Sequence, residues 1–255
     1  MENRNEDGLI AEKRIGISPD YQYRALNSSN FLQANWHNNK LVVLGKELSI
    51  NKDSVVLDLG TGSGNFEFAF WKSVKKIIGV DYNDEALAFL SSELKKRNIG
   101  NVELRQCDIR NLASLTGLGK VDAIVIMDVI EHIRIEEAKK VVGNIRGLLN
   151  AGGAVYVITP NYRSPWRFIE VILDKVSVLP KLEDEQHLAK YHKKNLCQLF
   201  SDGGFKVRSF HSFNLFSFII PGKKPASFFC KLELLCPFSV GNLIFGVFEK
   251  KENKN

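Results

Sequence analysis

The segment Val55–Gly64, with the sequence VVLDLGTGSG, carries residues suited to a ligand-binding loop. Its apolar half is typical of a buried parallel strand, and three glycines at alternate positions let the following backbone lie directly against a ligand. A dinucleotide-binding loop reads G-x-G-x-x-G, and its third glycine would replace Asn65. Asp58, just before the loop, would repel a phosphate but attract an ammonium or sulfonium group. The loop therefore predicts a cationic nucleoside without phosphate groups.

Further acidic residues follow the next two predicted strands. Asp81 comes about twenty residues after Gly60, and Asp108 follows the strand after that. Ligands of open parallel sheets bind at the carboxyl ends of the strands, where both acids are placed. Asp81 can accept hydrogen bonds from the two hydroxyls of a ribose. The alternative is that it only stabilises the N-terminus of the next helix.

Four blocks of sequence together resemble the class I S-adenosylmethionine-dependent methyltransferases. They are the glycine loop, Ile78–Tyr82 (IGVDY), Gln106–Ile109 (QCDI) and Ile126–His132 (IMDVIEH). The likeness covers residues 51–160 and continues more weakly over 187–248. It implies methyl transfer with S-adenosylmethionine as cofactor. It assigns cofactor binding to Asp58, Gly60, Gly62, Gly64, Asp81, Tyr82, Asp108, Ile109 and Met127.

The resemblance also implies a role for individual residues. Asp58 would face the methionine amino group, and Asp81 the ribose, with Tyr82 bordering it. Asp108 would accept a hydrogen bond from the adenine amino group, or else act as an ordinary helix-capping acid. Met127 would offer its backbone carbonyl and a polarizable side chain near the sulfonium.

Two histidines are candidates for a catalytic base. Methyl transfer mainly requires alignment of nucleophile, methyl carbon and sulfur, and a base helps when the acceptor is a hydroxyl. His132 ends a block that resembles the branch containing quinone-biosynthesis O-methyltransferases, and His187 begins the segment HLAKYHKKNL, similar to the same branch. A structural hydrogen-bonding role is the alternative for each.

The four cysteines form no C-x-x-C pair and no metal-ligand spacing, so no metal is expected.

The elements that position these residues alternate along the chain. Strand patterns cover 55–59, 76–80, 102–107, 121–127 and 154–159, and helical patterns cover 28–48, 65–74, 84–97 and 134–149. This alternation predicts an α/β fold: a Rossmann-like, doubly wound, mostly parallel sheet with helices on both faces. In the tail, 191–202 reads as a helix, and 205–210 and 243–249 read as strands. The resemblance implies seven strands, the last of them antiparallel.

We expect a single domain over residues 28–255 after a flexible N-terminal arm over 1–27. A helical insertion after the fifth strand, 161–186, has an apolar stripe that begins at Trp166. It either covers the substrate site as a lid or thickens the core. The segment Phe213–Phe238 interleaves phenylalanines with lysines, which suits either the headgroup boundary of a bilayer or core filling around the last strands.

Composition narrows the class of protein. The 255 residues are 44% hydrophobic and 25% charged, as in globular proteins, and no apolar run approaches the roughly 18–20 residues of a bilayer span. The N-terminal residues lack the apolar core of a signal peptide, so we expect a cytoplasmic protein, with peripheral contact at the inner membrane surface as an extension. The net charge of +6 is ordinary, and the chain has no specific nucleic-acid motif.

The predicted function is methyl transfer to the oxygen of a small molecule, with a hydrophobic or lipid-linked acceptor as one candidate. Three alternatives stay open at this point. They are an RNA or protein methyltransferase, a catalytically inactive cofactor-binding regulator, and an NAD-dependent oxidoreductase. Asn65 and Asp58 argue against the oxidoreductase. A dinucleotide-binding loop has its third glycine where this chain has Asn65, and it has no acid where this chain has Asp58. The acceptor and the oligomeric state are left open.

Overall fold

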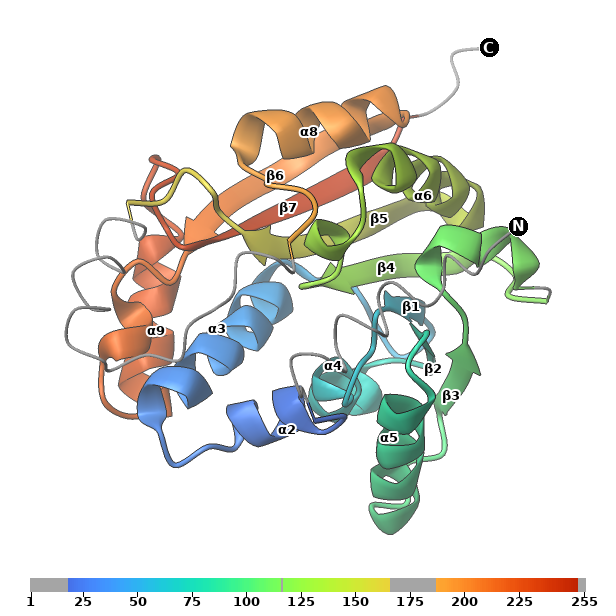
Figure 1. The fold of residues 1–255 in the computed structure, drawn as a ribbon, viewed down its shortest axis with the longest axis horizontal. Helices are drawn as coiled ribbons and strands as arrows, with labels where there is room; N and C mark the ends of the chain where they lie inside the picture. Colours follow the sequence, from blue (N-terminus) through green and yellow to red (C-terminus); the bar gives the residue numbers. More distant parts are fainter. Residues whose placement is uncertain (1–17, 116, 166–186, 252–255) are drawn as a thin grey trace.

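A computed structural model describes residues 18–115, 117–165 and 187–251. These residues form one seven-stranded sheet with helices packed around it (Figure 1). The strands are β1 (Val55–Leu59), β2 (Lys76–Asp81), β3 (Val102–Gln106), β4 (Val121–Met127), β5 (Leu149–Pro160), β6 (Phe205–Phe213) and β7 (Leu243–Lys250).

The strand order in the sheet is β3-β2-β1-β4-β5-β7-β6. The first five strands are all parallel, whereas β7 is antiparallel to both of its neighbours, β5 and β6. The chain therefore builds outward from β1 to β3, returns to the middle of the sheet and continues on the other side with β4. This topology confirms the predicted doubly wound fold with an antiparallel last strand.

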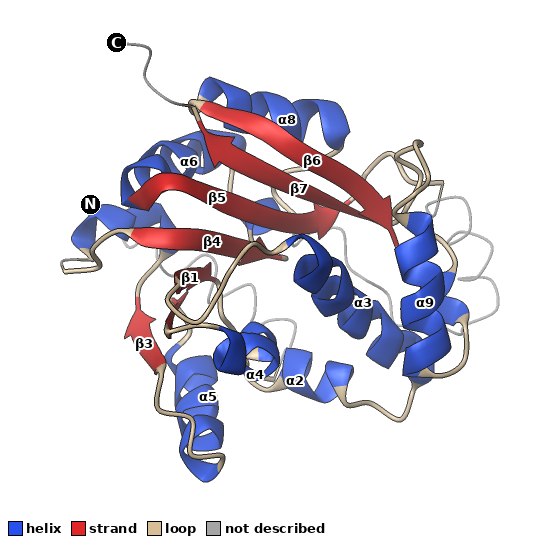
Figure 2. Ribbon diagram, turned by 180° about the vertical axis from the view of Figure 1, so that it is seen from behind, coloured by secondary structure: helices blue, strands red, loops and turns tan. Residues whose placement is uncertain are grey.

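Helices cover both faces of the sheet (Figure 2). The helices α6 and α8 pack on one face through Val141, Val142 and Leu196. On the other face α3, α4 and α9 contribute residues such as Leu44, Phe66 and Cys230. The helices are α2 (Tyr21–Leu26), α3 (Phe31–Glu47), α4 (Asn65–Phe70), α5 (Asp84–Lys96), α6 (Ile135–Leu148), α8 (Lys193–Asp202) and α9 (Lys223–Glu233).

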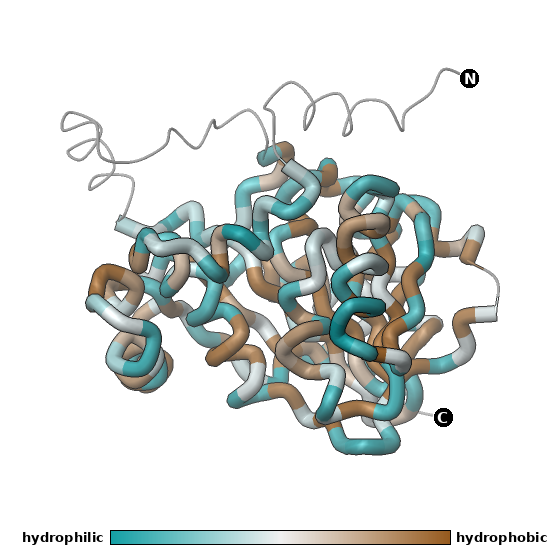
Figure 3. The backbone as a smooth tube through the Cα atoms, turned by 90° about the horizontal axis from the view of Figure 1, so that it is seen from below, coloured by the Kyte–Doolittle hydropathy of each residue, from teal (hydrophilic) through white to brown (hydrophobic). Residues whose placement is uncertain are grey.

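The sheet is hydrophobic on both faces because it is buried on both. The β4 residues Ile124 and Ile126 face one core, while Ala123 and Val125 face the other. A tube coloured by hydropathy shows hydrophobic segments running through the interior of the molecule (Figure 3). Within the described ranges, no helix is long and apolar enough to cross a membrane. Near-continuous apolar strands of this kind are expected for a covered parallel sheet.

The candidate site lies where the chain changes direction in the sheet. β1 leads to β2 on one side, and its other neighbour is β4, so the connections that leave β1 and β4 diverge to opposite faces. In open α/β sheets ligands bind in the crevice at such a point, beyond the carboxyl ends of the strands. The loops after Leu59, Asp81, Gln106 and Met127 all begin at this edge.

Two α-helices of the structure were not predicted from the sequence. Tyr21–Leu26 form the helix α2, although an irregular arm was expected up to residue 27. Lys223–Glu233 form the helix α9 inside the aromatic segment, for which no helix was predicted. Residues 1–17 and 166–186 lie outside the described part of the chain. The lid and core interpretations of the insertion therefore stay predictions.

Candidate functional site

The glycine loop between β1 and α4 is fixed to the end of β2. The N–H groups of Gly60 and Thr61 both donate to the carbonyl of Val80, at 2.7 and 3.1 Å. Gly60 has φ +80°, a backbone conformation that residues other than glycine rarely adopt. A Cβ at this position would lie 2.2 Å from a methyl carbon of Val129. Glycine is therefore required here for two reasons: the backbone has a positive φ, and a side chain would collide with Val129.

Asp81 ends β2 with its carboxylate directed at the glycine loop. It is 7% exposed and accepts hydrogen bonds from the N–H groups of Gly62 and Asn83, at 2.8 and 2.9 Å. These bonds tie the loop to β2 and fix the turn that leads into α5. The N-terminus of α5 itself is capped by the side chain of Asn83, so Asp81 acts on the loop and the turn, and its contact with a ribose stays a prediction. Tyr82, which follows, is half-buried at the same edge.

Asp108 follows β3 and caps the 3-10 helix η2 (Ile109–Ser114). Its Oδ1 accepts from the N–H of Arg110 at 2.8 Å, and its Oδ2 lies 2.9 Å from Nε of the same arginine. The bonds to Asp108 raise the pKa of Arg110. Ile109 and Cys107 are buried on either side. Asp108 is therefore a helix-capping acid in this structure. Its contact with adenine stays a prediction, in which Asp108 would also retain its hydrogen bonds to Arg110.

A buried pair of carboxyl groups lies beneath the loop. Asp58 is 2% exposed and Glu67, on α4, is 0% exposed. Thr61 Oγ1 donates to Glu67 Oε1 at 2.5 Å, whereas Asp58 Oδ1 and Glu67 Oε2 accept no hydrogen bond from the described residues. Burial and then the nearby Glu67 carboxylate raise the pKa of Asp58, and burial raises the pKa of Glu67 to about 7. The sequence analysis did not name Glu67 as a site residue. Its position as the single acid in the apolar run NFEFAF is the signal that could have identified it.

Asp58, Gly60 and Met127 come together around a small cavity. Its volume of about 20 Å³ is room for roughly one water molecule. The sequence analysis did not connect the helices α2 and α3 with this place, yet they supply part of the lining. Those lining residues are Gln22, His37, Lys40 and Leu41.

The helix α2 rests directly on the glycine loop. The N–H of Tyr23 donates to Ser63 Oγ at 2.8 Å, and the side chain of Asn65 donates to the carbonyl of Gln22 at 3.0 Å. The Tyr23 ring also packs against Phe68, with ring centroids 5.7 Å apart. The helix α2 therefore lies directly beside the loop along which the predicted ligand would bind.

A partly buried ion pair joins α3 to the end of β4. Lys40 Nζ bonds Asp128 Oδ2, and the lysine side chain is 7% exposed. Asp128 has φ +54°, an uncommon conformation for a residue other than glycine. Burial first, and the charge of Lys40 second, lower the pKa of the neighbouring His37 to about 3, so its imidazole is neutral near pH 7. The lysine balances a carboxylate that would otherwise face the cavity alone.

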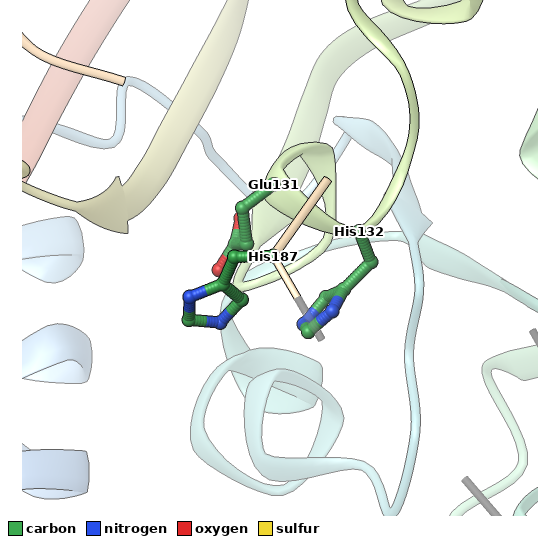
Figure 4. Close-up of side chains that lie close together, drawn as sticks. All are labelled: Glu131, His132 and His187. Atoms are coloured by element: carbon green, nitrogen blue, oxygen red, sulfur yellow. The ribbon is translucent and has the colours of Figure 1, made fainter. Parts of the chain in front are cut away.

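The two predicted histidines lie together beyond β4. The ring centroids of His132, in the 3-10 helix η3 (Ile130–His132), and His187, before α8, are 5.0 Å apart. Nδ1 of His187 is hydrogen-bonded to the hydroxyl of Tyr162. Figure 4 shows both rings beside the carboxylate of Glu131. The two histidines were predicted as separate candidates for a catalytic base, and the fold places them in one cluster.

Glu131 is the buried member of this cluster. It is 1% exposed, and its Oε2 accepts from Thr159 Oγ1 at 2.9 Å. Burial raises its pKa to about 7. One ligand atom from each of Glu131, His132 and His187 lies within 4.8 Å of the others, so the three could hold a metal ion, although none was expected from the sequence. The cluster is equally suited to accept and relay a proton.

A larger, open cavity of about 550 Å³ lies between α8 and β6. The predicted cofactor residues and the two predicted histidines are not among its lining residues, which include Arg163, His192, Lys193, Cys197 and Val207. The two halves of the candidate site are therefore the small cavity at β1 and the histidine cluster after β4. They are joined by Met127 and Asp128, which line the first and lead to the second.

Known proteins share both the sequence and the fold of this chain. A family model described as a methyltransferase domain matches residues 50–209, which is more than half of the chain. The chain belongs to the methyltransferase domain family. This assignment confirms the prediction of an S-adenosylmethionine-dependent methyltransferase and overturns the oxidoreductase alternative.

Individual relatives agree with the family. The methyltransferase is 28% identical over 173 residues to the ubiquinone biosynthesis O-methyltransferase of Acinetobacter baumannii (strain ACICU), a match that covers 68% of this chain and 67% of the relative. It is 30% identical over 115 residues to a probable cobalt-precorrin-6B C(15)-methyltransferase (decarboxylating) of Methanococcus maripaludis, covering 44% of this chain and 63% of the relative.

Solved structures confirm the fold of the methyltransferase. The magnesium protoporphyrin IX methyltransferase of Synechocystis PCC 6803 superposes with a TM-score of 0.63 at 13% identity, over 96% of this chain and 100% of the other. The N-methyltransferase NodS of Bradyrhizobium japonicum WM9 gives a TM-score of 0.59 at 12% identity, over 95% and 98%. At this level of identity the likeness concerns the fold, and the roles of individual residues stay predictions.

Proposed function

We propose that the methyltransferase methylates a hydroxyl oxygen of a small, hydrophobic acceptor. The observation that carries this proposal is the cluster of Glu131, His132 and His187 directly beyond β4, at the edge of the sheet where the glycine loop lies. A hydroxyl is a poor nucleophile until its proton is removed, so oxygen methylation gains from a base in this position. The similarity to a ubiquinone biosynthesis O-methyltransferase supports the same reaction.

The residues around the small cavity fit a cationic nucleoside. Asp58 lines the cavity, and its buried Oδ1 has no hydrogen-bond partner among the described residues. The ionised form of Asp58 is unfavourable without a partner, in keeping with its raised pKa, and a ligand ammonium would supply the missing charge and hydrogen bonds. In our proposal Asp58 binds the methionine amino group, Asp81 the ribose, and the backbone at Gly60 and Gly62 lies along the ligand.

The catalytic part of the proposal assigns proton removal to the histidine cluster. When bound, S-adenosylmethionine supplies a methyl group on a sulfonium leaving group. The acceptor oxygen forms the new bond to that methyl carbon as the bond to sulfur breaks, and the acceptor proton passes to His132 or His187. Tyr162 orients the ring of His187 through its hydroxyl. The resulting imidazolium lies beside Glu131, whose ionised form would stabilise it.

Labelled methyl transfer to a panel of acceptors tests the proposal. The purified protein is incubated with methyl-labelled S-adenosylmethionine and catechols or phenols with and without prenyl tails, next to matched aromatic amines. We expect label in methyl ethers, with faster transfer to the tailed phenols. Label only in amines, protein or RNA would contradict oxygen methylation of a small molecule. Calorimetry with S-adenosylhomocysteine in the same preparation shows independently that the cofactor site is intact.

Cofactor binding is expected to release protons near neutral pH. Glu67 has a pKa of about 7 in the free protein and that of Asp58 is also raised, so the pair holds protons that ordinary carboxyl groups would have lost. A ligand cation beside Asp58 favours the ionised forms and lowers both pKa values. Protons are therefore expelled on binding, and the affinity for S-adenosylmethionine should rise from pH 6 to pH 8. Calorimetry at pH 7 in buffers of different ionisation enthalpy measures the number released.

Glu67→Gln is the matched control for this proton release. The substitution keeps an acceptor oxygen for Thr61 but removes one titrating group, so we expect fewer protons released and a flatter pH dependence. In the free protein a raised carboxyl pKa costs stability as the pH rises above the unfolded value of roughly 4.3, because the folded state must then carry a buried charge. Glu67→Gln should therefore raise the melting temperature more at pH 8 than at pH 5. Equal binding heats in all buffers would refute the proton linkage.

A further inference from the structure

The helix α9 has two apolar faces, of which the rest of the fold uses one. Ala226, Cys230 and Leu234 follow each other every four residues and are buried against the core and α3. On the opposite face Phe228 is 58% exposed and Leu232 45% exposed, and Leu235, just after the helix, is 71% exposed. A surface helix normally carries polar residues on its outer side. The outer face of α9 therefore lacks the composition that contact with water alone would favour.

This apolar surface extends beyond the helix to the segments on either side. In the described part of the chain twelve large hydrophobic residues are exposed, and seven of them fall between residues 216 and 238. Of the phenylalanines in the segment Phe213–Phe238 only Phe213 and Phe218 are buried, so core filling does not account for the others. We call the seven exposed residues the α9 surface: Phe216, Ile219, Phe228, Phe229, Leu232, Leu235 and Phe238.

Within residues 214–241, which contain the α9 surface, three of the four charged residues are positive. Lys223, Lys224 and Lys231 are exposed, whereas Glu233 is the sole acid between residues 214 and 241. Glu233 turns inward, where its Oε1 accepts from the N–H groups of Phe216 and Ser217 at 2.7 and 2.8 Å. The outward charge beside the apolar residues is therefore carried by lysines.

The α9 surface lies at the catalytic edge of the sheet. The β6–β7 connection that contains α9 leaves the sheet at Phe213 and returns at Leu243, and Leu243 is paired with Pro160 at the carboxyl end of β5. This is the same edge at which β1 and β4 end. α9 packs against α3, beside which it lies in Figures 1 and 2. On α3, Asn38 donates to Ser227 of α9 at 3.0 Å, while Lys40 lines the cavity.

We propose that the α9 surface binds the face of an anionic lipid bilayer. Exposed phenylalanine and leucine side chains flanked by lysines match the acyl boundary and the negative headgroups of such a membrane. A second copy of the chain fits less well, because a two-fold interface would place the lysines of one copy against those of the other. Docked in this way, the methyltransferase would hold its catalytic edge beside acceptors dissolved in the bilayer. This last consequence rests on the proposed function, whereas the binding itself does not.

Vesicle co-sedimentation tests the proposal with the full-length protein under reducing conditions, because Cys236 is exposed. The probes are vesicles of phosphatidylcholine alone and of phosphatidylcholine with phosphatidylglycerol. We expect binding to the anionic vesicles that Phe228→Ser/Phe229→Ser weakens by about tenfold or more, since two large apolar side chains leave the contact. Lys224→Gln/Lys231→Gln should weaken it by about fivefold per lysine and reduce its salt sensitivity.

Matched substitutions outside the surface serve as controls. Ile135, 40% exposed at the start of α6, and the exposed Lys139 offer the same kinds of change at a distance, so Ile135→Ser and Lys139→Gln should bind like wild type. S-Adenosylhomocysteine calorimetry on every variant shows that the fold and the cofactor site are retained. Lack of pelleting with anionic vesicles, pelleting that is the same for all variants, or self-association that the Phe228→Ser/Phe229→Ser change abolishes would each overturn the proposal. None of these outcomes would alter the result of the acceptor assay with soluble phenols.

Discussion

Asp81→Ala is expected to weaken binding of S-adenosylhomocysteine by about 30- to 150-fold, or roughly 2–3 kcal/mol. Two contributions combine. In the proposed site the ribose hydroxyls lose a charged acceptor, and such charge-assisted bonds are about twice as strong as neutral ones. In addition, the N–H of Gly62 loses its partner at 2.8 Å, so the glycine loop is no longer tied to β2. Titration calorimetry of the variant against wild type measures the loss.

Asp84→Ala is the matched control for Asp81→Ala. Asp84 is exposed in the first turn of α5, three residues further on, and its substitution should leave the affinity within about twofold, as for most surface positions. Asp81→Asn separates the two contributions, because an amide oxygen can still accept from Gly62 while the charge is lost. Thermal unfolding of each variant shows whether the loop alone has loosened. If Asp81→Ala binds as tightly as wild type, the ribose does not lie at Asp81.

His132→Ala and His187→Ala are expected to slow turnover by about 10²- to 10³-fold while cofactor affinity stays nearly unchanged. Each substitution removes a ring from the cluster beyond β4 without touching the glycine loop. The rings lie 5.0 Å apart, so either can take over part of the task of the other, and the double variant should be slower than both. Initial rates with the acceptor found in the labelling assay, together with S-adenosylhomocysteine titration, separate the two effects.

A role in catalysis differs from a role in folding in its pH profile. With a base at work, turnover of wild type falls at acid pH, and the histidine variants should lose this limb and regain rate with added imidazole. His192→Ala provides the control, since His192 starts α8 and lines the separate cavity near β6. Tyr162→Phe should lower turnover less than His187→Ala, because only the orientation of the ring is affected. Wild-type rates in both alanine variants would remove the histidines from the mechanism.

The sequence predicted those parts of the fold whose pattern is local. The apolar run before Asp58 and the helical spacing of Leu87, Leu90 and Leu94 each arise within one element, and both are observed. α9 escaped prediction because Ala226, Cys230 and Leu234 face inward while apolar residues also cover the outer side, so no polar face marks the period. α2 escaped because it is only six residues long and is fixed by its contacts with Ser63 and Asn65.

The candidate site shows the same division. Residues at strand ends could be predicted, because the sheet must bring the carboxyl ends of parallel strands to one edge. The pair of Lys40 and Asp128 joins residues 88 positions apart, and local pattern contains no sign of it beyond a lysine on a helix that also buries Asn35 and Asn39. The clustering of His132 with His187 likewise depends on how the segment before α8 packs against η3, which local sequence does not specify.

The contact between α2 and the glycine loop has a kinetic consequence. Hydrogen bonds from Tyr23 to Ser63 and from Asn65 to Gln22 tie this helix to the loop along which the proposed nucleoside would lie. A nucleoside that enters beside α2 would break this contact on loading and again when the spent product leaves. Such a step would limit how fast one molecule of enzyme exchanges its nucleoside, however fast the methyl group itself is transferred.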